Sequence, residues 1–121
     1  ALLEIAESPS LFLRGMAGSR IPVAVAHGEG RAVFDGAIDQ AAVDVALRYV
    51  EGGRTADSYP ANPNGSPDGI AGVASRDGRA TILMPHPERT LRTANFSWAP
   101  RDWPDDSPWL RMFRNARAWL G

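Results

Sequence analysis

The 121-residue sequence contains no cysteine and no lysine, and both absences limit what the chain can do. Without cysteine it can form no disulfide, no thiolate metal site and no thiol nucleophile. All thirteen basic residues are arginines, and they are scattered without forming a patch. With a formal net charge of −1, the sequence predicts neither nucleic acid nor an acidic membrane surface as a partner.

The sequence also lacks a long hydrophobic run. No stretch of about 18 apolar residues is present, so no membrane-spanning helix is expected. The first residues, ALLEIAE, have no basic start and no long apolar core, so no secretory signal is visible and a cytoplasmic protein is expected. At 44% hydrophobic residues, the chain fits one globular domain or a large piece of one. Because it enters a strand-like run directly at Ala1, we expect it to be cut from a longer protein.

Short strands are predicted along the N-terminal half. Leu2–Ala6 and the alternating, β-rich Val45–Val50 have strand patterns. Ile21–Ala26 is a continuous apolar run, typical of a strand that is covered on both faces. Arg31–Phe34 follows a glycine-containing turn and is expected to form a return strand, and Asp39 can cap a short helix through about Asp44.

A second region, beyond residue 54, is organised by a loop and a hairpin. Thr55–Asp68 is rich in proline, asparagine, glycine and serine and predicts a long loop, which could clamp a ligand or merely connect. Ile70–Ser75 and Ala80–Met84 are expected to pair as a hairpin, because Asp77-Gly78 between them favours a type I′ turn.

The last element is predicted to be a helix. Asp106-Ser107 can cap it, Pro108 suits the first helical position and Gly121 closes the end. Its apolar residues are spaced 4, 3 and 4 apart and form one stripe, namely Trp109, Phe113, Ala116 and Leu120. All four tryptophans fall in this C-terminal region and are expected to pack the tail, or else to meet a partner domain.

The segment Met-Pro-His-Pro-Glu-Arg, residues 84–89, carries the strongest chemical signal. Pro85 and Pro87 fix their own φ angles and disfavour helical geometry in the residues before them, which predicts an extended backbone from 84 to 88. Side chains at i and i+2 of an extended chain share one side, with Cα atoms roughly 6–7 Å apart. His86 and Glu88 are therefore candidate catalytic residues, a general base and the carboxylate that orients it.

Other interpretations of these residues stay open from the pattern alone. His86 could be a turn histidine beside a solvated carboxylate. His27 and Glu29 form a second His-x-Glu pair, and the two pairs together could serve a metal-dependent hydrolase, although the spacing matches no established metal motif and no metal site is predicted. A non-catalytic interaction module presenting the tryptophan-rich tail is the remaining alternative.

Several blocks of the sequence, taken together, resemble one family, the phosphoribosylformylglycinamidine synthases (formylglycinamide ribonucleotide amidotransferases) in their long single-chain form. The resemblance runs from about Ser8 to Gly121. The blocks are SPSLFLRGMAGSRIPVAVAHGEGR, ALRYV, YPANPNGSPDGIAGV, TILMPHPERT and SPWLRMFRNARAWLG, and the combination of NPNGS with AHGEG and MPHPER is far more specific than any one block.

The resemblance implies an ATP-dependent C–N ligase of purine biosynthesis, whose C-terminal glutaminase domain uses a Cys-His-Glu triad to supply ammonia. His86 and Glu88 match the catalytic histidine and glutamate of its motif. The catalytic cysteine of the family lies earlier in the domain, and this sequence departs from the pattern because it has none. Glutamine and the synthase domain of the same full-length chain are the implied partners. ATP and Mg²⁺ would bind in other domains, so no cofactor is expected in residues 1–121.

The implied fold is α/β, with an open mixed sheet flanked by helices. Residues 1–121 would form the C-terminal part of a triad-type glutamine amidotransferase domain, including later, partly antiparallel strands and the closing helix. The half that carries the nucleophile would be absent. Alone, the chain is therefore expected to hydrolyse no glutamine.

Overall fold

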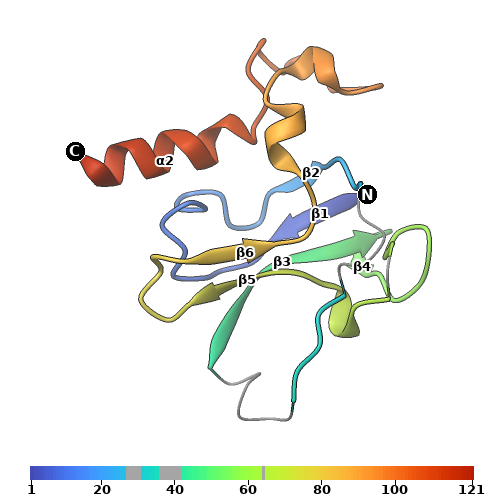
Figure 1. Cartoon of the computed structure of the whole chain (residues 1–121). Coiled ribbons are helices and arrows are strands. Elements are labelled where there is room, and N and C mark those ends of the chain that lie inside the picture. The colour runs from blue at the N-terminus through green and yellow to red at the C-terminus, as the bar shows by residue number, and fades with distance from the viewer. Residues whose placement is uncertain (27–30, 36–41, 64) are drawn as a thin grey trace.

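The structure, a computed structural model, describes residues 1–26, 31–35, 42–63 and 65–121 (Figure 1). Its strands are β1 (Leu2–Ile5), β2 (Arg20–Pro22), β3 (Val43–Glu51), β4 (Arg54–Thr55), β5 (Ile70–Ser75) and β6 (Thr81–Leu83). The described residues also form three 3-10 turns, η1 (Pro67–Gly69) before β5, and η2 (Pro87–Thr90) and η3 (Thr93–Asn95) after β6. One α-helix, α2 (Leu110–Leu120), ends the chain.

The strands form one sheet in the order β2-β1-β3-β5-β6, with the short β4 paired to β3. Every pairing between these strands is antiparallel. The expected α/β class is thus met only in part. Antiparallel strands and a closing helix are present, but the described residues show a curled antiparallel sheet with one α-helix rather than an open sheet flanked by helices.

The two faces of the sheet follow from alternation along the strands. Leu3 lies opposite Ile21 on β2 and Tyr49 on β3, and all three side chains are buried in the core. The next residue, Glu4, points to the other face, where its carboxylate accepts a hydrogen bond of 2.7 Å from Arg20 Nε. Because successive side chains of a strand point to opposite faces, one face of the sheet is apolar here and the other is charged.

The run Ile21–Ala26 is not the covered central strand that its composition predicts. The paired strand is only Arg20–Pro22, and it lies at the edge of the sheet. Proline has no backbone N–H to donate, so Pro22 is tolerated at the end of an edge strand. Residues 31–34 form no strand, so the predicted return strand is wrong. Asp39 lies outside the described residues, but Asp44 belongs to β3 rather than to the end of a helix.

The remaining strand predictions are confirmed, and the first of them, Leu2–Ala6, corresponds to β1. Val45–Val50 lies within the longer β3, and β5 and β6 pair as the expected hairpin. At the turn of that hairpin Gly78 has a φ of +75°, and the Asp77 carboxylate accepts hydrogen bonds from the Ser75 hydroxyl and the Arg79 amide. A type I′ turn needs a positive φ at both central residues, and Asp77 does not have one, so the hairpin is confirmed but the expected turn type is wrong.

The C-terminal helix begins two residues later than predicted, at Leu110, and packs only its first turns. Trp109 and Met112 are buried in the core, whereas Phe113 is 46% exposed and Leu120 is 72% exposed. Asn115 anchors the helix by donating its amide hydrogens to two carbonyl oxygens of the loop between β1 and β2. The predicted apolar stripe is therefore buried at its first residue, Trp109, and exposed at its last, Leu120.

The tryptophans pack the tail only in part. Trp103 meets Phe96 edge to face, with ring centroids 5.5 Å apart, while Trp98 is largely exposed. Trp119 is half-exposed and lies under the guanidinium of Arg79 at 5.7 Å. Within the described part of the chain, no helix is long and apolar enough to cross a bilayer.

Candidate active site at the end of the β5–β6 hairpin

The candidate residues follow strand β6 at the point where the chain leaves the sheet. After Leu83, the backbone of His86 donates a hydrogen bond of 2.9 Å to the Ala24 carbonyl oxygen. This bond holds the histidine backbone against the segment that leaves β2. The next four residues form η2, with Pro87 in its first position and Glu88 in its first turn.

The expected extended backbone from 84 to 88 is therefore wrong in its second half. His86 has φ −116° and ψ 77°, and the chain then turns into the 3-10 helix. A proline restricts the residue before it, but it also suits the first position of a helical turn, and that second tendency decides the conformation here. The pair meets across the start of a turn and not along a strand.

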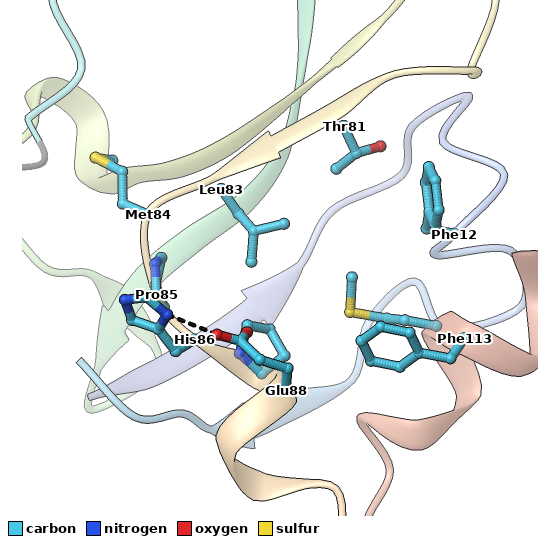
Figure 2. Close-up of a pocket in the computed structure, with 10 residues that line it drawn as sticks. Phe12, Thr81, Leu83, Met84, Pro85, His86, Glu88 and Phe113 are labelled. Atoms are coloured by element: carbon cyan, nitrogen blue, oxygen red, sulfur yellow. Dashed lines mark hydrogen bonds and ion pairs between the residues drawn. The ribbon is translucent and has the colours of Figure 1, made fainter. Parts of the chain in front are cut away.

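The turn brings the two predicted side chains together. His86 Nδ1 and Glu88 Oε1 are 2.7 Å apart, as Figure 2 shows with a dashed line. Both side chains remain accessible, because that of His86 is 30% exposed and that of Glu88 is 53% exposed. A surface pair of this kind adds little to stability, so its geometry is more informative about chemistry than about folding.

Electrostatics assign the roles within the pair. Desolvation acts to raise the pKa of Glu88, but the hydrogen bond from His86, a backbone hydrogen bond and the nearby positive charges together lower it below its ordinary value. Glu88 is thus ionised near neutral pH and can only accept. Nδ1 of His86 must then carry the hydrogen, which leaves Nε2 of the neutral ring with a free lone pair, the requirement for a general base.

A cleft of about 340 Å³ opens beside the pair. It lies between strand β6, the turn η2 and helix α2, and Figure 2 shows Phe12 and Phe113 across from His86 and Glu88. The full lining is Phe12, Thr81, Leu83, Met84, Pro85, His86, Pro87, Glu88, Met112 and Phe113. A mostly apolar cleft with one titratable pair at its edge has the form of a small-molecule site.

The proline-rich loop serves the fold rather than this cleft. Asn62 is fully buried, and its amide nitrogen donates to the Ala56 and Ser66 carbonyl oxygens at 3.1 and 2.9 Å. Its amide oxygen accepts from the Ser66 backbone at 3.2 Å. These bonds satisfy the asparagine within its own loop, as expected for an Asx-type connection. Asn64, the second asparagine of the loop, lies outside the described residues.

The second His-x-Glu pair, His27 and Glu29, also lies outside the described residues. Among the residues that are described, no group of three or more histidine, cysteine, aspartate or glutamate side chains is arranged to hold a metal ion. The site that can be described is therefore a histidine–carboxylate pair at the edge of an apolar cleft, the arrangement of an acid–base half-site in nucleophilic catalysis.

A family model covers nearly the whole chain. Residues 1–120 match the model of the CobB/CobQ-like glutamine amidotransferase domain, and the chain belongs to this family.

One solved structure refines the comparison. The chain is similar to a chain in the structure of PurLQS from Thermotoga maritima, with 28% sequence identity and a TM-score of 0.64. The similarity covers 99% of this chain but only 46% of that one. The described sheet and helix thus correspond to about half of a larger chain.

Proposed function

We propose that these 121 residues are part of the glutaminase domain of a phosphoribosylformylglycinamidine synthase of purine biosynthesis. The observation that carries the proposal is the 2.7 Å contact between His86 Nδ1 and Glu88 Oε1 at the edge of an apolar cleft. Membership of a glutamine amidotransferase family and the similarity to a PurLQS chain support the same reading.

In this proposal His86 is the general base and Glu88 is its orienting carboxylate. His86 Nε2 takes the proton of a cysteine thiol, and the thiolate attacks the side-chain carbonyl of glutamine. The resulting imidazolium, stabilised by Glu88, then gives its proton to the departing ammonia. Water hydrolyses the glutamyl thioester that remains, and His86 serves as base a second time.

The nucleophile must come from outside this chain, because its sequence contains no cysteine. Nε2 of His86 has no hydrogen-bonding partner among the described residues, and in Figure 2 it points away from Glu88. We infer that a cysteine-bearing segment of the same domain is placed against this side of the histidine. The ammonia would pass to a synthase domain of the same cytoplasmic protein, where ATP and Mg²⁺ would bind.

The proposal is tested in the full-length protein that carries this chain, by measuring product formation with glutamine and then with ammonium as nitrogen source. His86→Asn removes the proton carrier and is expected to lower the glutamine-dependent rate by about 10²–10⁴-fold. Glu88→Gln keeps the shape but can favour the wrong tautomer, so we expect a large but smaller loss. Both variants should retain the ammonium-dependent rate.

Arg89→Ala is the matched control, because Arg89 lies in the same turn and is exposed but carries no catalytic proton. It should leave both rates close to those of the unmodified protein. An equal loss of both rates in His86→Asn would assign the histidine to folding or to the synthase reaction. No loss in either rate would remove His86 from the mechanism altogether.

A further inference from the structure

The turn that carries Glu88 is held from behind by buried hydroxyl groups. Thr90 Oγ1 donates a hydrogen bond of 3.1 Å to the Pro87 carbonyl oxygen, which closes η2 on itself. The hydroxyl of Ser107 donates to the carbonyl oxygen of Thr90, and the Ser107 backbone donates to the Leu91 carbonyl oxygen at 2.9 Å. Thr90 and Ser107 are only 6% and 3% exposed, so these bonds are shielded from water.

Ser107 also links the turn to the start of helix α2. Its Oγ accepts a hydrogen bond of 3.3 Å from the backbone of Trp109, a fully buried residue. The indole nitrogen of Trp109 in turn donates to the Pro22 carbonyl oxygen at 2.6 Å. Two residues beyond Pro22, the Ala24 carbonyl oxygen receives the backbone hydrogen of His86.

The two ends of the catalytic pair are therefore connected through one hydroxyl. On one side, Ser107 holds the carbonyl at the end of the turn that bears Glu88. On the other, Ser107 reaches the backbone of His86 through Trp109 and the segment that leaves β2. Neither link touches the cleft, because Ser107 and Trp109 are not among the residues that line it.

We propose that Ser107 is a positioning residue for the His86–Glu88 pair, a role that rests on the function proposed above. Its hydroxyl fixes η2 against the core, so that Glu88 Oε1 stays within hydrogen-bonding distance of His86 Nδ1 and keeps the hydrogen on that nitrogen. Both side chains of the pair are partly exposed and cannot be held by packing alone. Small displacements of catalytic groups lower the reaction rate strongly. Loss of the buried hydroxyl behind the turn should therefore lower the rate measurably.

The first measurement reads the tautomer of His86 directly. The ¹⁵N shifts of its ring, assigned with the His86→Asn variant, are recorded in the full-length protein at a pH where the ring is neutral. The unmodified protein should show the Nδ1-protonated form that the glutamate selects. Ser107→Ala should shift the ring toward the Nε2-protonated form that a free imidazole prefers, and Ser107→Thr, which keeps the hydroxyl, should restore the original tautomer.

The second measurement separates positioning from binding. Ser107→Ala is expected to lower kcat for glutamine hydrolysis about 10-fold while KM changes by less than about twofold, since the cleft itself is untouched. Ser75→Ala is the control, because the Ser75 hydroxyl also joins two segments but lies at the far end of the hairpin, beside Asp77. That variant should change neither the tautomer nor kcat.

The outcomes separate the two proposals. If folded Ser107→Ala keeps the tautomer and kcat of the unmodified protein, Ser107 is not a positioning residue. If Ser107→Ala does not fold, Ser107→Cys decides by the same criteria, because a thiol keeps a small side chain at this position but is only a weak hydrogen-bond donor and acceptor. If the unmodified protein shows no glutamine turnover, the proposed function fails, whereas the tautomer measurement still tests Ser107.

Discussion

Two proline-containing loops of this chain put their polar side chains to opposite uses. In the loop of residues 58–66 the central polar residue, Asn62, is fully buried and uses its amide group to satisfy the surrounding backbone. In the segment of residues 84–90, His86 and Glu88 remain partly exposed and bond to each other. Here the buried polar groups, those of Thr90 and Ser107, lie behind the pair.

The difference shows how polar residues of the fold can be told from polar residues of the site. A buried polar group whose every atom is bonded to backbone is costly to remove and serves stability. A titratable pair that is partly exposed to solvent contributes little to stability. A short hydrogen bond within such a pair therefore points to a catalytic role rather than to a role in folding. The comparison therefore predicts a large stability effect in the first loop and a large activity effect with little stability effect in the second.

The largest stability effect is expected at Asn62. Asn62→Ala removes three buried hydrogen bonds, to the carbonyl oxygens of Ala56 and Ser66 and from the Ser66 backbone N–H, although the Ser66 carbonyl oxygen still accepts a hydrogen bond from the Gly69 N–H. Loss of a partner for a buried polar group costs about 1–3 kcal/mol, so a loss of about 3 kcal/mol or more in the free energy of unfolding is expected from the three bonds together. The measurement is urea unfolding, with Glu88→Ala as the contrast, for which a loss below about 1 kcal/mol is expected. Similar losses of unfolding free energy in Asn62→Ala and Glu88→Ala would contradict the assignment of the first loop to stability and of the second to activity.

A second stability effect is expected at the turn of the β5–β6 hairpin, which orients the strand leading to His86. Gly78 has a φ of +75°, and a Cβ there would lie 2.0 Å from the Pro9 carbonyl oxygen. Gly78→Ala should therefore lower the free energy of unfolding by about 2–4 kcal/mol, from backbone strain and overlap together.

Gly18→Ala is the control for that prediction. Gly18 has a φ of +86°, but a Cβ there would meet no atom within 4 Å. Only the strain of the left-handed conformation, about 1–2 kcal/mol, should remain. The difference between the urea midpoints of the two variants therefore measures the destabilisation caused by the overlap with Pro9. Equal midpoints would show that the hairpin turn moves away from the Ser8–Leu11 segment without loss of stability.

The sequence predicted the elements that have strong local patterns. The period-two alternation of β3 predicts a strand and Asp77-Gly78 predicts a hairpin, and both elements are confirmed, although the turn is not of type I′. The pairing of His86 with Glu88 could also be predicted, although for an incorrect reason, because two residues of separation allow contact both along a strand and across a 3-10 turn.

What the sequence could not show depends on contacts between distant segments. An apolar run such as Ile21–Ala26 is equally compatible with a central strand and with an edge, and only its neighbours decide. The sequence predicts Asp106-Ser107 as the helix cap, but the N-cap of α2 is Trp109, without a side-chain cap hydrogen bond. The Ser107 hydroxyl instead donates to Thr90, and Trp109 bonds to a residue 87 positions away in the sequence. No local pattern encodes these links, so the sequence does not predict the hydrogen bonds between η2, Ser107 and Trp109.

Tyr49 sharpens the comparison, because it is buried like Asn62 but its hydroxyl has no hydrogen-bond partner among the described residues. Tyr49→Phe should therefore be neutral or stabilise the protein by about 1 kcal/mol, the reverse of the effect at Asn62. Burial raises the pKa of Tyr49 from 10.0 to about 12, which favours the neutral form in the folded state. That stabilisation is complete below the unfolded pKa and is lost as pH rises through the folded one.

The measurement at Tyr49 is urea unfolding at neutral pH and again at rising alkaline pH. The unmodified protein should lose stability between pH 10 and about 12 from this residue, and Tyr49→Phe should lose less over the same range. A clear destabilisation of Tyr49→Phe at neutral pH would mean that the hydroxyl is bonded after all, and Tyr49 would then resemble Asn62.

The smallest effect is expected in the titration of Glu88, and it tests whether the pair is held as the structure shows. Desolvation favours a higher pKa for Glu88, and the His86 hydrogen bond is the largest of the opposing influences that bring the pKa below its ordinary value. His86→Ala removes that bond and leaves part of the desolvation, so the pKa should rise clearly. Arg89→Ala, which removes the weakest of these influences, should raise it only slightly. The carboxyl ¹³C shift of Glu88 followed against pH gives both values.

The sign of the stability change follows from the lowered pKa. The contribution of the pair is present above the unfolded pKa of Glu88 and disappears as pH falls through the lower, folded value. It should be small, because the carboxylate is 53% exposed and water screens its charge. An unchanged Glu88 pKa in His86→Ala would mean that the two side chains do not stay in contact in solution. The histidine would then lack its orienting group, and the assignment of the free lone pair to Nε2 would lose its basis.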